Sequence, residues 1–285
     1  MPRIVYVNGA YHPEAEAKVS VFDRGFLFAD AVYEVTAVIG GRLLDFPGHC
    51  ARLRRSLAEL DLPSPATDDE ILAIHRELVA RNALDLGHVY LTVTRGEADR
   101  DFAYPKAGTA PSLVMFTQAR ASIETPEAER GLRIASVPDL RWGRRDIKTV
   151  QLLYPSMAKM QAKRQGKDDA WFVENGEVTE GTSNNAYIVT REGTIRTRAL
   201  GHDILHGITR AALMRVAGEL DLRVEEKPFT VAEAQGAREA FITSAGAFVT
   251  PVVEIDGAAI GDGRPGPIAR RLRAAYLETA IARAI

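Results

Sequence analysis

Cysteine is almost absent from this chain of 285 residues, which contains only Cys50. A single cysteine excludes an intrachain disulfide framework and is typical of proteins that stay in a reducing compartment. We interpret Cys50 as a small buried hydrophobic residue on a helix, because unpaired cysteines are among the most buried residue types. Long apolar stretches are missing too, since residues 1–15 contain no run of signal-peptide length and no segment approaches the length of a membrane span. We therefore expect a cytoplasmic protein with no membrane partner.

A strong net charge and a regular βαβ alternation are also lacking. The formal net charge is −2, which argues against a general role in binding nucleic acid or a membrane surface. Strands and helices alternate irregularly and show no βαβ period, which argues against a dinucleotide-binding fold. What is present is the composition of a globular protein, with 46% hydrophobic and 26% charged residues, and enough chain for one large or two ordinary domains.

Hydrophobic patterns in the first 117 residues predict strands accompanied by two helices. Runs of β-branched and aromatic residues favour strands, and Asn8-Gly9 and Gly40-Gly41 are typical of hairpin turns. A helical period covers residues 48–60, and the capping box Thr67-Asp68-Asp69-Glu70 starts a second helix. The predicted strands are 4–7, 31–39, 42–44, 88–94 and 112–117. The polar loop 95–111 has the length of a functional or disordered segment.

The remaining chain begins with a polar, proline-bearing linker at 118–130 that shows no helical or strand period. Apolar runs and alternation then predict strands at 132–137, 146–150, 170–174, 186–189, 239–243 and 249–255. Helical periods predict helices at 156–165, 208–220 and 267–285, and a short capped helix at 230–233.

Two features of the second half suggest chemistry by themselves. The stretch 178–210 places Glu180 and small polar residues in a turn and opens a helix at Gly207-Ile208-Thr209. The outward-pointing first amides of such a helix favour a phosphate, although many helices start this way for capping alone. Lys148 lies on an alternating segment, where desolvation would favour a nucleophilic amine. A surface lysine paired with Asp146 is the alternative.

The spacing of this stretch resembles the signature of the class IV aminotransferases, a family of pyridoxal-phosphate enzymes. The family pattern has an acid, a small residue two places on, and Asn-Ala-Tyr, and the chain has Glu180, Thr182 and Asn185-Ala186-Tyr187. The downstream pattern is matched by Ile195-x-Thr197 and by Leu205-x-Gly207-Ile208-x-Arg210. A match over about thirty positions is specific.

This resemblance covers nearly the whole chain and implies an α/β (α+β) protein with the two-domain fold type IV, most like D-amino acid aminotransferase. It implies a smaller N-terminal α/β domain at 1–117, an interdomain linker at 118–126, and a larger C-terminal domain at 127–285 that carries the Schiff-base lysine. It also implies a homodimer in which the long loop near Arg100 reaches the partner's active site.

The resemblance further implies how pyridoxal 5'-phosphate is held. Lys148, 32 positions before Glu180, matches the catalytic Schiff-base lysine, and Glu180 would face the pyridine nitrogen and keep the ring protonated. Arg52 matches the phosphate-contacting arginine, unless it belongs to a solvated face with Arg54 and Arg55. No metal is expected. The implied cofactor-binding residues are Lys148, Glu180, Arg52, Ser183, Asn184, Leu205, Ile208, Thr209, Ser244 and Ala245.

Substrate recognition is implied by two further segments. A tyrosine that contacts the substrate carboxylate in D-amino acid aminotransferases corresponds to Tyr33. These enzymes also use an Arg-x-His of the long loop, and this chain has Arg100 but carries Phe102 in place of the histidine, which removes a donor and adds an apolar wall. The implied substrate-binding residues are Tyr33, Arg100, Phe28, Val35 and Arg24.

Which arginine binds the substrate carboxylate stays open at this point. Arg100 lies in the loop that the family uses for this purpose. Arg24 is either a further carboxylate ligand or one partner of a structural salt bridge with Asp23 or Glu34.

The implied activity is a ping-pong transamination in two half-reactions on one lysine. It would move an amino group from a D-amino acid such as D-alanine to a 2-oxo acid such as 2-oxoglutarate, so a small-molecule donor and acceptor are the expected partners. A branched-chain L-amino acid or (R)-amine transaminase is the first alternative. The second alternative is an aminodeoxychorismate lyase-type enzyme. The third is a protein that retains the cofactor pocket only for binding or regulation.

Overall fold

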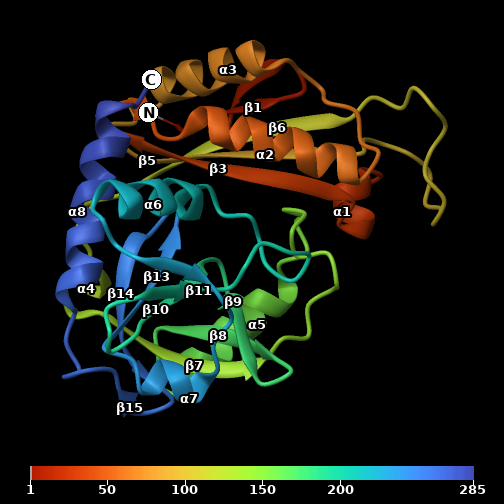
Figure 1. The fold of residues 1–285 in the computed structure, drawn as a ribbon. Coiled ribbons are helices and arrows are strands. Elements are labelled where there is room, and N and C mark those ends of the chain that lie inside the picture. The colour runs from red at the N-terminus through yellow and green to blue at the C-terminus, as the bar shows by residue number, and fades with distance from the viewer. Residues whose placement is uncertain (1) are drawn as a thin grey trace. The chain divides into compact units, whose positions relative to one another are not determined.

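The structure, a computed structural model, describes residues 2–285. Within these residues the chain forms two compact units, and each is described by itself (Figure 1). The first comprises 2–123, 147–151 and 283–285, and the second comprises 124–146 and 152–282. The predicted domain limits 1–117, 118–126 and 127–285 stay a prediction. The segment 147–151, which carries Lys148, groups with the N-terminal residues and not with the C-terminal ones.

The first unit contains an antiparallel sheet of six described strands. These are β1 (Ile4–Val7), β2 (Ala10–Pro13), β3 (Ala31–Ile39), β4 (Arg42–Leu43), β5 (Leu86–Thr94) and β6 (Ser112–Ala119). They lie in the order β2-β1-β6-β5-β3-β4, so the predicted hairpins β1–β2 and β3–β4 are confirmed. Asn8 and Gly9 have φ angles of 46° and 98°, the positive values that the first turn requires.

Two helices, α2 (Phe46–Glu59) and α3 (Asp68–Arg81), pack on this sheet (Figure 1). Both begin close to where the sequence predicted. Cys50 lies in α2 and is buried, as expected for a small hydrophobic residue. The helices and the sheet share one apolar cluster, whose members include Val32, Val38, Leu53, Leu57, Ile71, Leu78, Val89, Leu91 and Met115.

A short helix, α1 (Arg24–Phe28), precedes β3 and was not predicted, because five residues carry too little helical period. The polar loop 95–111 between β5 and β6 extends beyond the ends of these strands (Figure 1). Its first residues run beside α1, since Arg24 N donates to Gly96 O at 2.9 Å and Ala98 N donates to Phe22 O at 3.3 Å.

The second unit contains a mixed sheet of nine strands within its described residues. These are β7 (Leu132–Pro138), β8 (Asp169–Glu174), β9 (Glu177–Gly181), β10 (Asn185–Val189), β11 (Ile195–Thr197), β12 (Val224–Glu226), β13 (Glu239–Ser244), β14 (Phe248–Ile255) and β15 (Ala258–Ala259). The order is β12-β11-β10-β13-β14-β7-β8-β9, with β15 paired to β14. The pairs β11–β12, β14–β7 and β7–β8 are parallel.

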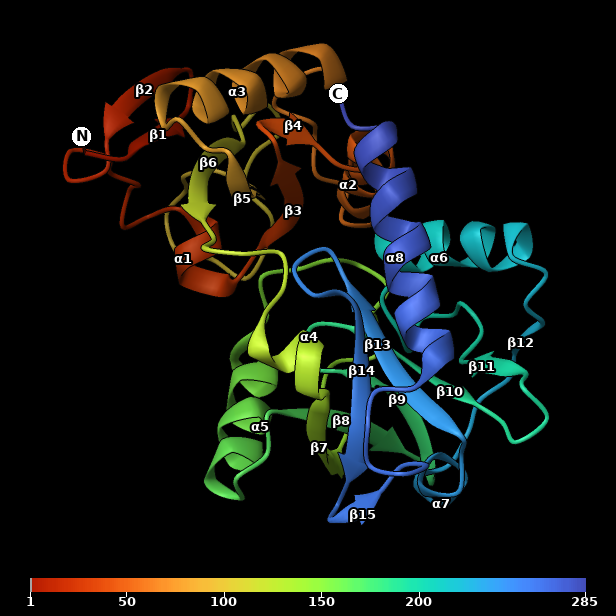
Figure 2. The same ribbon diagram turned by 90° about the vertical axis from the view of Figure 1, so that its left-hand side faces the viewer.

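The helices of this unit lie on its sheet (Figure 2). Helix α5 (Leu153–Arg164) connects the parallel strands β7 and β8, an arrangement that the sequence did not predict because an irregular segment separates β7 from the helix. Helices α6 (Ile208–Glu219) and α8 (Pro267–Ala282) pack on each other and on β13, and two short helices complete the unit, α4 (Pro126–Arg130) and α7 (Val231–Gln235). Among residues 2–285, no helix is both long enough and apolar enough to span a bilayer.

Three local predictions are wrong. The segment 118–130 is not irregular throughout, because its first two residues end β6 and its last five form α4. The segment 146–150 is not a regular strand, since it makes one isolated bridge, Val32 to Thr149, and turns where Thr149 N donates to Ile147 O. Glu180 lies in β9 and not in the turn that follows it.

The capping box of α3 gives a test of the local structure. Thr67 Oγ1 accepts from the Glu70 amide, so Thr67→Ala should lower the free energy of unfolding by about 1 kcal/mol in urea denaturation. Ser64→Ala, which removes only a bond to Ala66 O in an exposed turn, is the control and should change it by less than about 0.5 kcal/mol. Equal losses in the two variants would contradict the capping role.

Candidate active site

Lys148 lies in the first unit, on the irregular segment beside the start of β3. Its carbonyl oxygen accepts from Tyr33 N at 3.0 Å, and its amide donates to Ser56 Oγ at 3.3 Å. Its Nζ lies 4.1 Å from the centre of the Tyr33 ring. Asp146, the expected partner of a surface lysine, instead accepts bonds from Arg144. The backbone of Lys148 is therefore fixed at two points, and its amine rests on an aromatic ring.

The side chains of β3 point alternately to the two faces of the first sheet. Successive side chains of a strand point to opposite faces, so Tyr33 and Val35 share one face and Glu34 lies on the other. Glu34 is buried beside α2, whereas Tyr33 and Val35 are only half buried. The Lys148 amine is therefore on the face that also carries the two predicted substrate residues of β3.

Arg52 is buried beside Glu34 and does not belong to a solvated face with Arg54 and Arg55. Its Nε and Nη2 donate to the two carboxylate oxygens of Glu34, each at 2.7 Å, and His49 Nδ1 lies 2.7 Å from Glu34 Oε2. Burial alone would raise the pKa of Glu34, but the Arg52 guanidinium and His49 lower it to about 2. The ion pair fixes the orientation of Arg52, whose contact with a phosphate stays a prediction.

Glu180 is the centre of a buried hydrogen-bond network in the second unit. Arg141 Nη1 donates to Glu180 Oε1 at 2.6 Å. Glu180 Oε2 accepts from Asn185 Nδ2 at 3.0 Å and from the Leu205 amide at 3.1 Å. Because a carboxylate has about four acceptor positions, one remains for a further N–H donor.

The guanidinium of Arg141 bridges Glu180 to a second buried acid. Its Nε and Nη2 donate to the two oxygens of Asp139 at 2.9 and 2.7 Å, and its Cζ lies 4.3 Å from the centre of the Phe172 ring. Asp139 also accepts from Thr179 Oγ1 at 2.7 Å. Burial raises the pKa of Glu180 above that of an ordinary glutamate, and Arg141 opposes this rise. Glu180 is therefore an acid suited to sharing a proton with a basic nitrogen.

The start of α6 lies next to this network. Gly207 is the N-cap and provides no side chain, so no side chain caps the first amides of the helix. A Cβ at position 207 would lie 2.1 Å from Asn185 Oδ1, which leaves room only for glycine. Asn185 Nδ2 also donates to Leu205 O at 3.0 Å. The amides of Ile208 and Thr209 and the positive end of the helix dipole thus suit a phosphate.

A second turn lies beside the first residue of β10. Asn185 is paired with Thr243, so the turn that follows β13 begins next to it. Ser244 Oγ in this turn accepts from the Ala247 amide at 3.0 Å. Ala245 has no polar side chain, so it could contact a phosphate only through its backbone, and that contact stays a prediction.

The turn between β9 and β10 separates two neighbouring predicted residues. Asn184 is buried and its Nδ2 donates to Asp169 Oδ2 at 3.0 Å, while Thr182 Oγ1 donates to Asp169 Oδ1 at 2.5 Å. Ser183, which stands between them, is exposed. Asp169 therefore fixes this turn, and its role could not be read from the sequence.

The two candidate carboxylate ligands differ in their surroundings. Arg24 is only 3% exposed, and its Nε donates to Asp30 Oδ2 at 2.8 Å. A structural salt bridge therefore exists, but with Asp30 and not with the expected Asp23 or Glu34. Arg100 is exposed in the loop. Both substrate roles stay predictions.

The predicted residues thus fall into two sets. The first unit holds Lys148, Arg52, Tyr33, Phe28, Val35, Arg24 and Arg100, and the second holds Glu180, Ser183, Asn184, Leu205, Ile208, Thr209, Ser244 and Ala245. The donor set fits pyridoxal phosphate by its chemistry: an amine for the aldehyde, a buried acid with an acceptor position for the ring nitrogen, and uncapped amides for the phosphate.

Sequence reasoning missed the residues that hold Glu180. Arg141 stands in an arginine-rich segment 39 positions before Glu180, and no local pattern pairs the two. The available signal was Asp139-x-Arg141, an acid and a base two places apart after a predicted strand, which puts them on one side of an extended chain. Asn185 was noted as part of the signature, but not as a ligand of Glu180.

A reactive amine, a buried acid and an uncapped helix start are what a pyridoxal-phosphate enzyme requires, and the sequence model of the family described as Amino-transferase class IV matches residues 31–255. The chain belongs to the class IV aminotransferases, which are pyridoxal-phosphate enzymes. Over 273 residues, which are 95% of both chains, it is 39% identical to the D-alanine aminotransferase of Bacillus licheniformis. It is 35% identical to the D-alanine aminotransferase of Staphylococcus aureus strain N315 over 95% of this chain and 96% of that protein.

Solved structures confirm the predicted fold type IV. The branched-chain aminotransferase of Thermoproteus uzoniensis, solved with norvaline, matches 98% of this chain and 95% of its own with a TM-score of 0.87 and 27% identity. The branched-chain amino acid aminotransferase of Escherichia coli has a TM-score of 0.89, over 98% of this chain and 95% of its own, and at 23% identity it shows similarity of fold alone.

The ion pair between Glu34 and Arg52 predicts a loss of stability in acid. Because the pKa of Glu34 is about 2 in the folded state, below its ordinary value, the stabilisation is complete above the ordinary pKa and is lost as the pH falls toward 2. A shift of this size corresponds to about 3 kcal/mol. Urea denaturation at a series of pH values should therefore show a smaller loss between neutral and acid pH for Glu34→Gln than for the wild type. Glu77→Gln, which breaks the exposed pair with Arg81, is the control, and an unchanged pH dependence in Glu34→Gln would contradict the role of this pair.

The buried network around Glu180 predicts that Arg141 stabilises the second unit. Arg141→Gln leaves Asp139 and Glu180 without their shared cation, which should lower the free energy of unfolding by about 3 kcal/mol in urea denaturation. Arg130→Gln is a matched control, because Arg130 also donates twice to an aspartate, Asp168, but is 42% exposed. The control should cost less than about 1 kcal/mol. A smaller loss for Arg141→Gln than for the control would show that the network does not carry stability.

Proposed function

We propose that the chain is a D-amino acid transaminase that moves the amino group of a donor such as D-alanine to a 2-oxo acid such as 2-oxoglutarate. The relatives named D-alanine aminotransferase, matched over 95% of the chain, support this donor class. The observation that carries the proposal is the Lys148 amine, which rests on the Tyr33 ring and is held in no ion pair within the described residues of the first unit.

Pyridoxal phosphate, when bound, supplies a conjugated ring that accepts the electron pair left on the substrate α-carbon after its proton departs. Lys148 would bind it covalently through Nζ, and Glu180 would hold a proton at the ring nitrogen with its remaining acceptor position. The amides of Ile208 and Thr209, the Ala245 backbone and the Arg52 guanidinium would contact the phosphate.

Lys148 is also the residue that moves the proton. Once the donor amine has displaced it, its Nζ takes the proton of the substrate α-carbon, and in the second half-reaction it returns a proton to the α-carbon of the acceptor. The backbone bonds to Tyr33 and Ser56 and the contact with the Tyr33 ring keep the amine in place between these steps.

The donor would be held by its carboxylate. Tyr33 offers a hydroxyl on the same face of β3 as the Lys148 amine, and Val35 adds an apolar surface two residues on. Arg100 is the free guanidinium of the long loop, whereas Arg24 is already paired with Asp30. A guanidinium can bind a carboxylate by two parallel hydrogen bonds.

Transamination of branched-chain L-amino acids or (R)-amines is the second candidate. It is supported by Phe102, an 81% exposed residue that stands where the D-amino acid enzymes are expected to have a histidine, and by the similarity to the branched-chain enzyme of Thermoproteus uzoniensis. An exposed apolar ring in the loop would favour apolar donors.

We further propose that the enzyme is a homodimer in the cytoplasm. Three large apolar side chains are exposed at helical spacing on α5, with Leu153 76%, Met157 57% and Met160 50% exposed, and such patches mark protein interfaces. The location is supported by Cys50, the sole cysteine, which is free and buried.

A half-reaction tests the proposed donor. Enzyme loaded with pyridoxal phosphate and mixed with D-alanine, without a 2-oxo acid, should convert the absorbance of the lysine-bound cofactor to that of the pyridoxamine form. Faster conversion by L-leucine or (R)-1-phenylethylamine would favour the second candidate. No conversion by any of the three donors would refute both transaminase assignments.

Lys148 should be the site of covalent attachment. Borohydride reduction of the loaded enzyme followed by peptide mass mapping should place a pyridoxyl group on the peptide that contains Lys148. Lys148→Ala should lower kcat by at least about a hundredfold, because it removes both the attachment point and the base. Lys227→Ala, at an exposed position of the second unit, should leave kcat unchanged. A pyridoxyl group on another lysine would overturn the assignment.

A further inference from the structure

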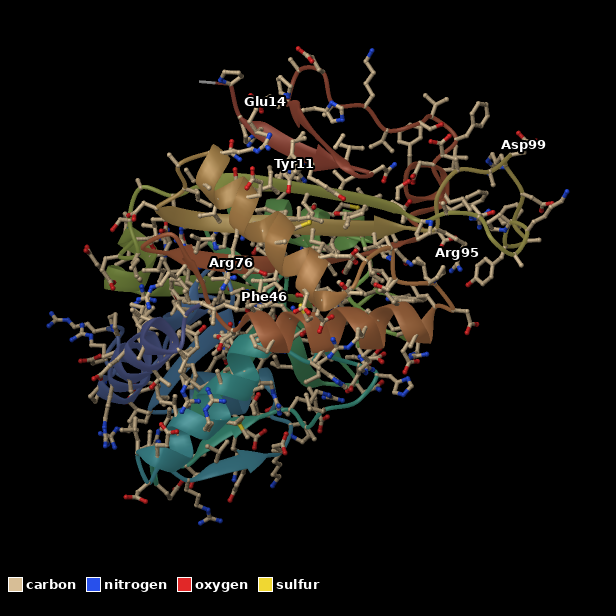
Figure 3. The ribbon with its side chains drawn as sticks, turned by 90° about the horizontal axis from the view of Figure 1, so that it is seen from above. Tyr11, Glu14, Phe46, Arg76, Arg95 and Asp99 are labelled. Carbon is tan, nitrogen blue, oxygen red and sulfur yellow. The ribbon has the colours of Figure 1, made fainter. Side chains whose placement is uncertain are left out.

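In the first unit, three arginines and three aromatic rings alternate in one stack between α1 and the loop 95–111. The distances between the guanidinium Cζ and the ring centre range from 3.7 Å for Arg95 on Tyr104 to 5.9 Å for Arg24 on Tyr104. Figure 3 shows Arg95 where the loop leaves the sheet and Asp99 near its outer end. The stack runs in the order Arg95, Tyr104, Arg24, Phe28, Arg100 and Phe102.

The charges along this stack are compensated unequally. Asp30 Oδ2 accepts from Arg24 Nε and from Arg95 Nε, each at 2.8 Å, so one carboxylate serves two guanidinium groups. Arg95 also donates to the carbonyl oxygens of Leu60 and Asp61. Arg100 has no hydrogen bond or ion pair among residues 2–285. Among the three guanidinium groups of the stack, that of Arg100 is therefore exposed and has no counter-ion within residues 2–285.

Arg24 fixes the backbone on both sides of Phe102. Its Nη1 donates to Asp101 O at 2.7 Å and to Ala103 O at 3.3 Å, and its side chain is buried. With these two carbonyl groups held, the Phe102 ring meets the Phe28 ring edge to face, with centres 5.6 Å apart. Arg100 lies over both rings, 5.1 Å from the centre of Phe28 and 5.5 Å from that of Phe102.

We propose that Phe28 and Phe102 are positioning residues that hold the Arg100 guanidinium for the carboxylate of the amino donor, and that Arg24 fixes the loop and binds no substrate. The proposal rests on the proposed function and narrows it, because it requires a donor that bears a carboxylate. Ring contacts restrict the rotamers of a long side chain that would otherwise lose much entropy on binding. They also leave its N–H groups without an acceptor, so these groups remain for a carboxylate.

The proposed role of Phe102 is to position Arg100 without contacting the donor. A phenyl ring offers no hydrogen bond to a carboxylate, so it can act only through the position of Arg100. A change of the ring should therefore alter the binding of the donor and not the transfer of the proton. Such a change should therefore raise KM for the donor and leave kcat nearly unchanged.

Steady-state kinetics with D-alanine as donor test the positioning role. Phe102→Leu should raise KM for D-alanine about 3- to 30-fold, the factor expected for loss of one cation–π contact, while kcat changes less than about twofold. Phe102→Tyr keeps a ring and should restore the wild-type KM. Phe116→Leu is a matched control, because it removes a ring that stacks on Tyr90 at 4.9 Å, away from the arginine stack. An unchanged KM in Phe102→Leu, or a loss of KM and kcat together that Phe102→Tyr does not restore, would overturn the proposal.

Limited trypsin digestion tests the stack independently of activity. The loop contains two exposed residues after which trypsin can cleave, Arg100 and Lys106, whereas Arg95 is buried. Peptide mass spectrometry can follow cleavage at both exposed positions. Phe28→Leu and Phe102→Leu should increase cleavage after Arg100 severalfold relative to cleavage after Lys106, because only Arg100 is held by the rings. An unchanged ratio in both variants would show that the rings do not hold Arg100.

The variant Arg24→Gln distinguishes whether Arg24 fixes the loop or binds the donor. If Arg24 fixes the loop, the variant should be cleaved faster at both positions in the absence of any substrate. A rise in KM without faster cleavage would show that Arg24 binds the donor itself and would overturn that part of the proposal.

If the wild type converts no donor, the proposed function fails, and the digestion still decides whether the stack holds Arg100. If the wild type converts D-alanine and Phe102→Leu does so equally well, the function stands and this inference fails.

Discussion

A carboxylate that is buried in a protein must be compensated, and this requirement organises the second unit around Glu180. Its three donors come from three separate stretches of chain: the segment after β7, the first residue of β10, and the turn before α6. Each stretch is therefore bound to the same two oxygen atoms. Arg141 can serve Glu180 because a second acid, Asp139, holds the rest of its guanidinium. The stretch that leads into α6 is thereby held beside the acid.

The first unit also contains a buried carboxylate that must be compensated, that of Glu34. The alternation of β3 directs Glu34 toward α2, where Arg52 and His49 compensate its charge, and directs Tyr33 toward the opposite face. Lys148 reaches that face on an irregular segment whose backbone is bound to Tyr33 and Ser56. One strand thus separates the buried ion pair of Glu34 and Arg52 from the Tyr33 ring on which the Lys148 amine rests.

The similarity to known proteins indicates the reaction type, whereas the contacts of the loop concern the choice of donor. The family match fixes the reaction type, and relatives named D-alanine aminotransferase share the chain almost from end to end. The loop bears on donor choice, because it is the part in which this chain departs from the expected histidine at Phe102. Asp30 compensates two arginines of the loop region and leaves Arg100 as the third. Donor recognition would then depend on how rigidly one uncompensated guanidinium is held.

The sequence by itself determined the strands and helices with a clear period, the capping boxes at Thr67 and Thr230, the hairpin at Asn8-Gly9 and the family signature around Glu180, because each of these depends on residues close together in the chain. Only the tertiary structure decided that Arg141 pairs with Glu180 and that Asp30, not Asp23 or Glu34, pairs with Arg24. It also decided that 146–150 makes a single bridge and that five residues form α1. Ion pairs between distant residues depend on how elements pack, and a periodic pattern in the chain carries no record of that packing.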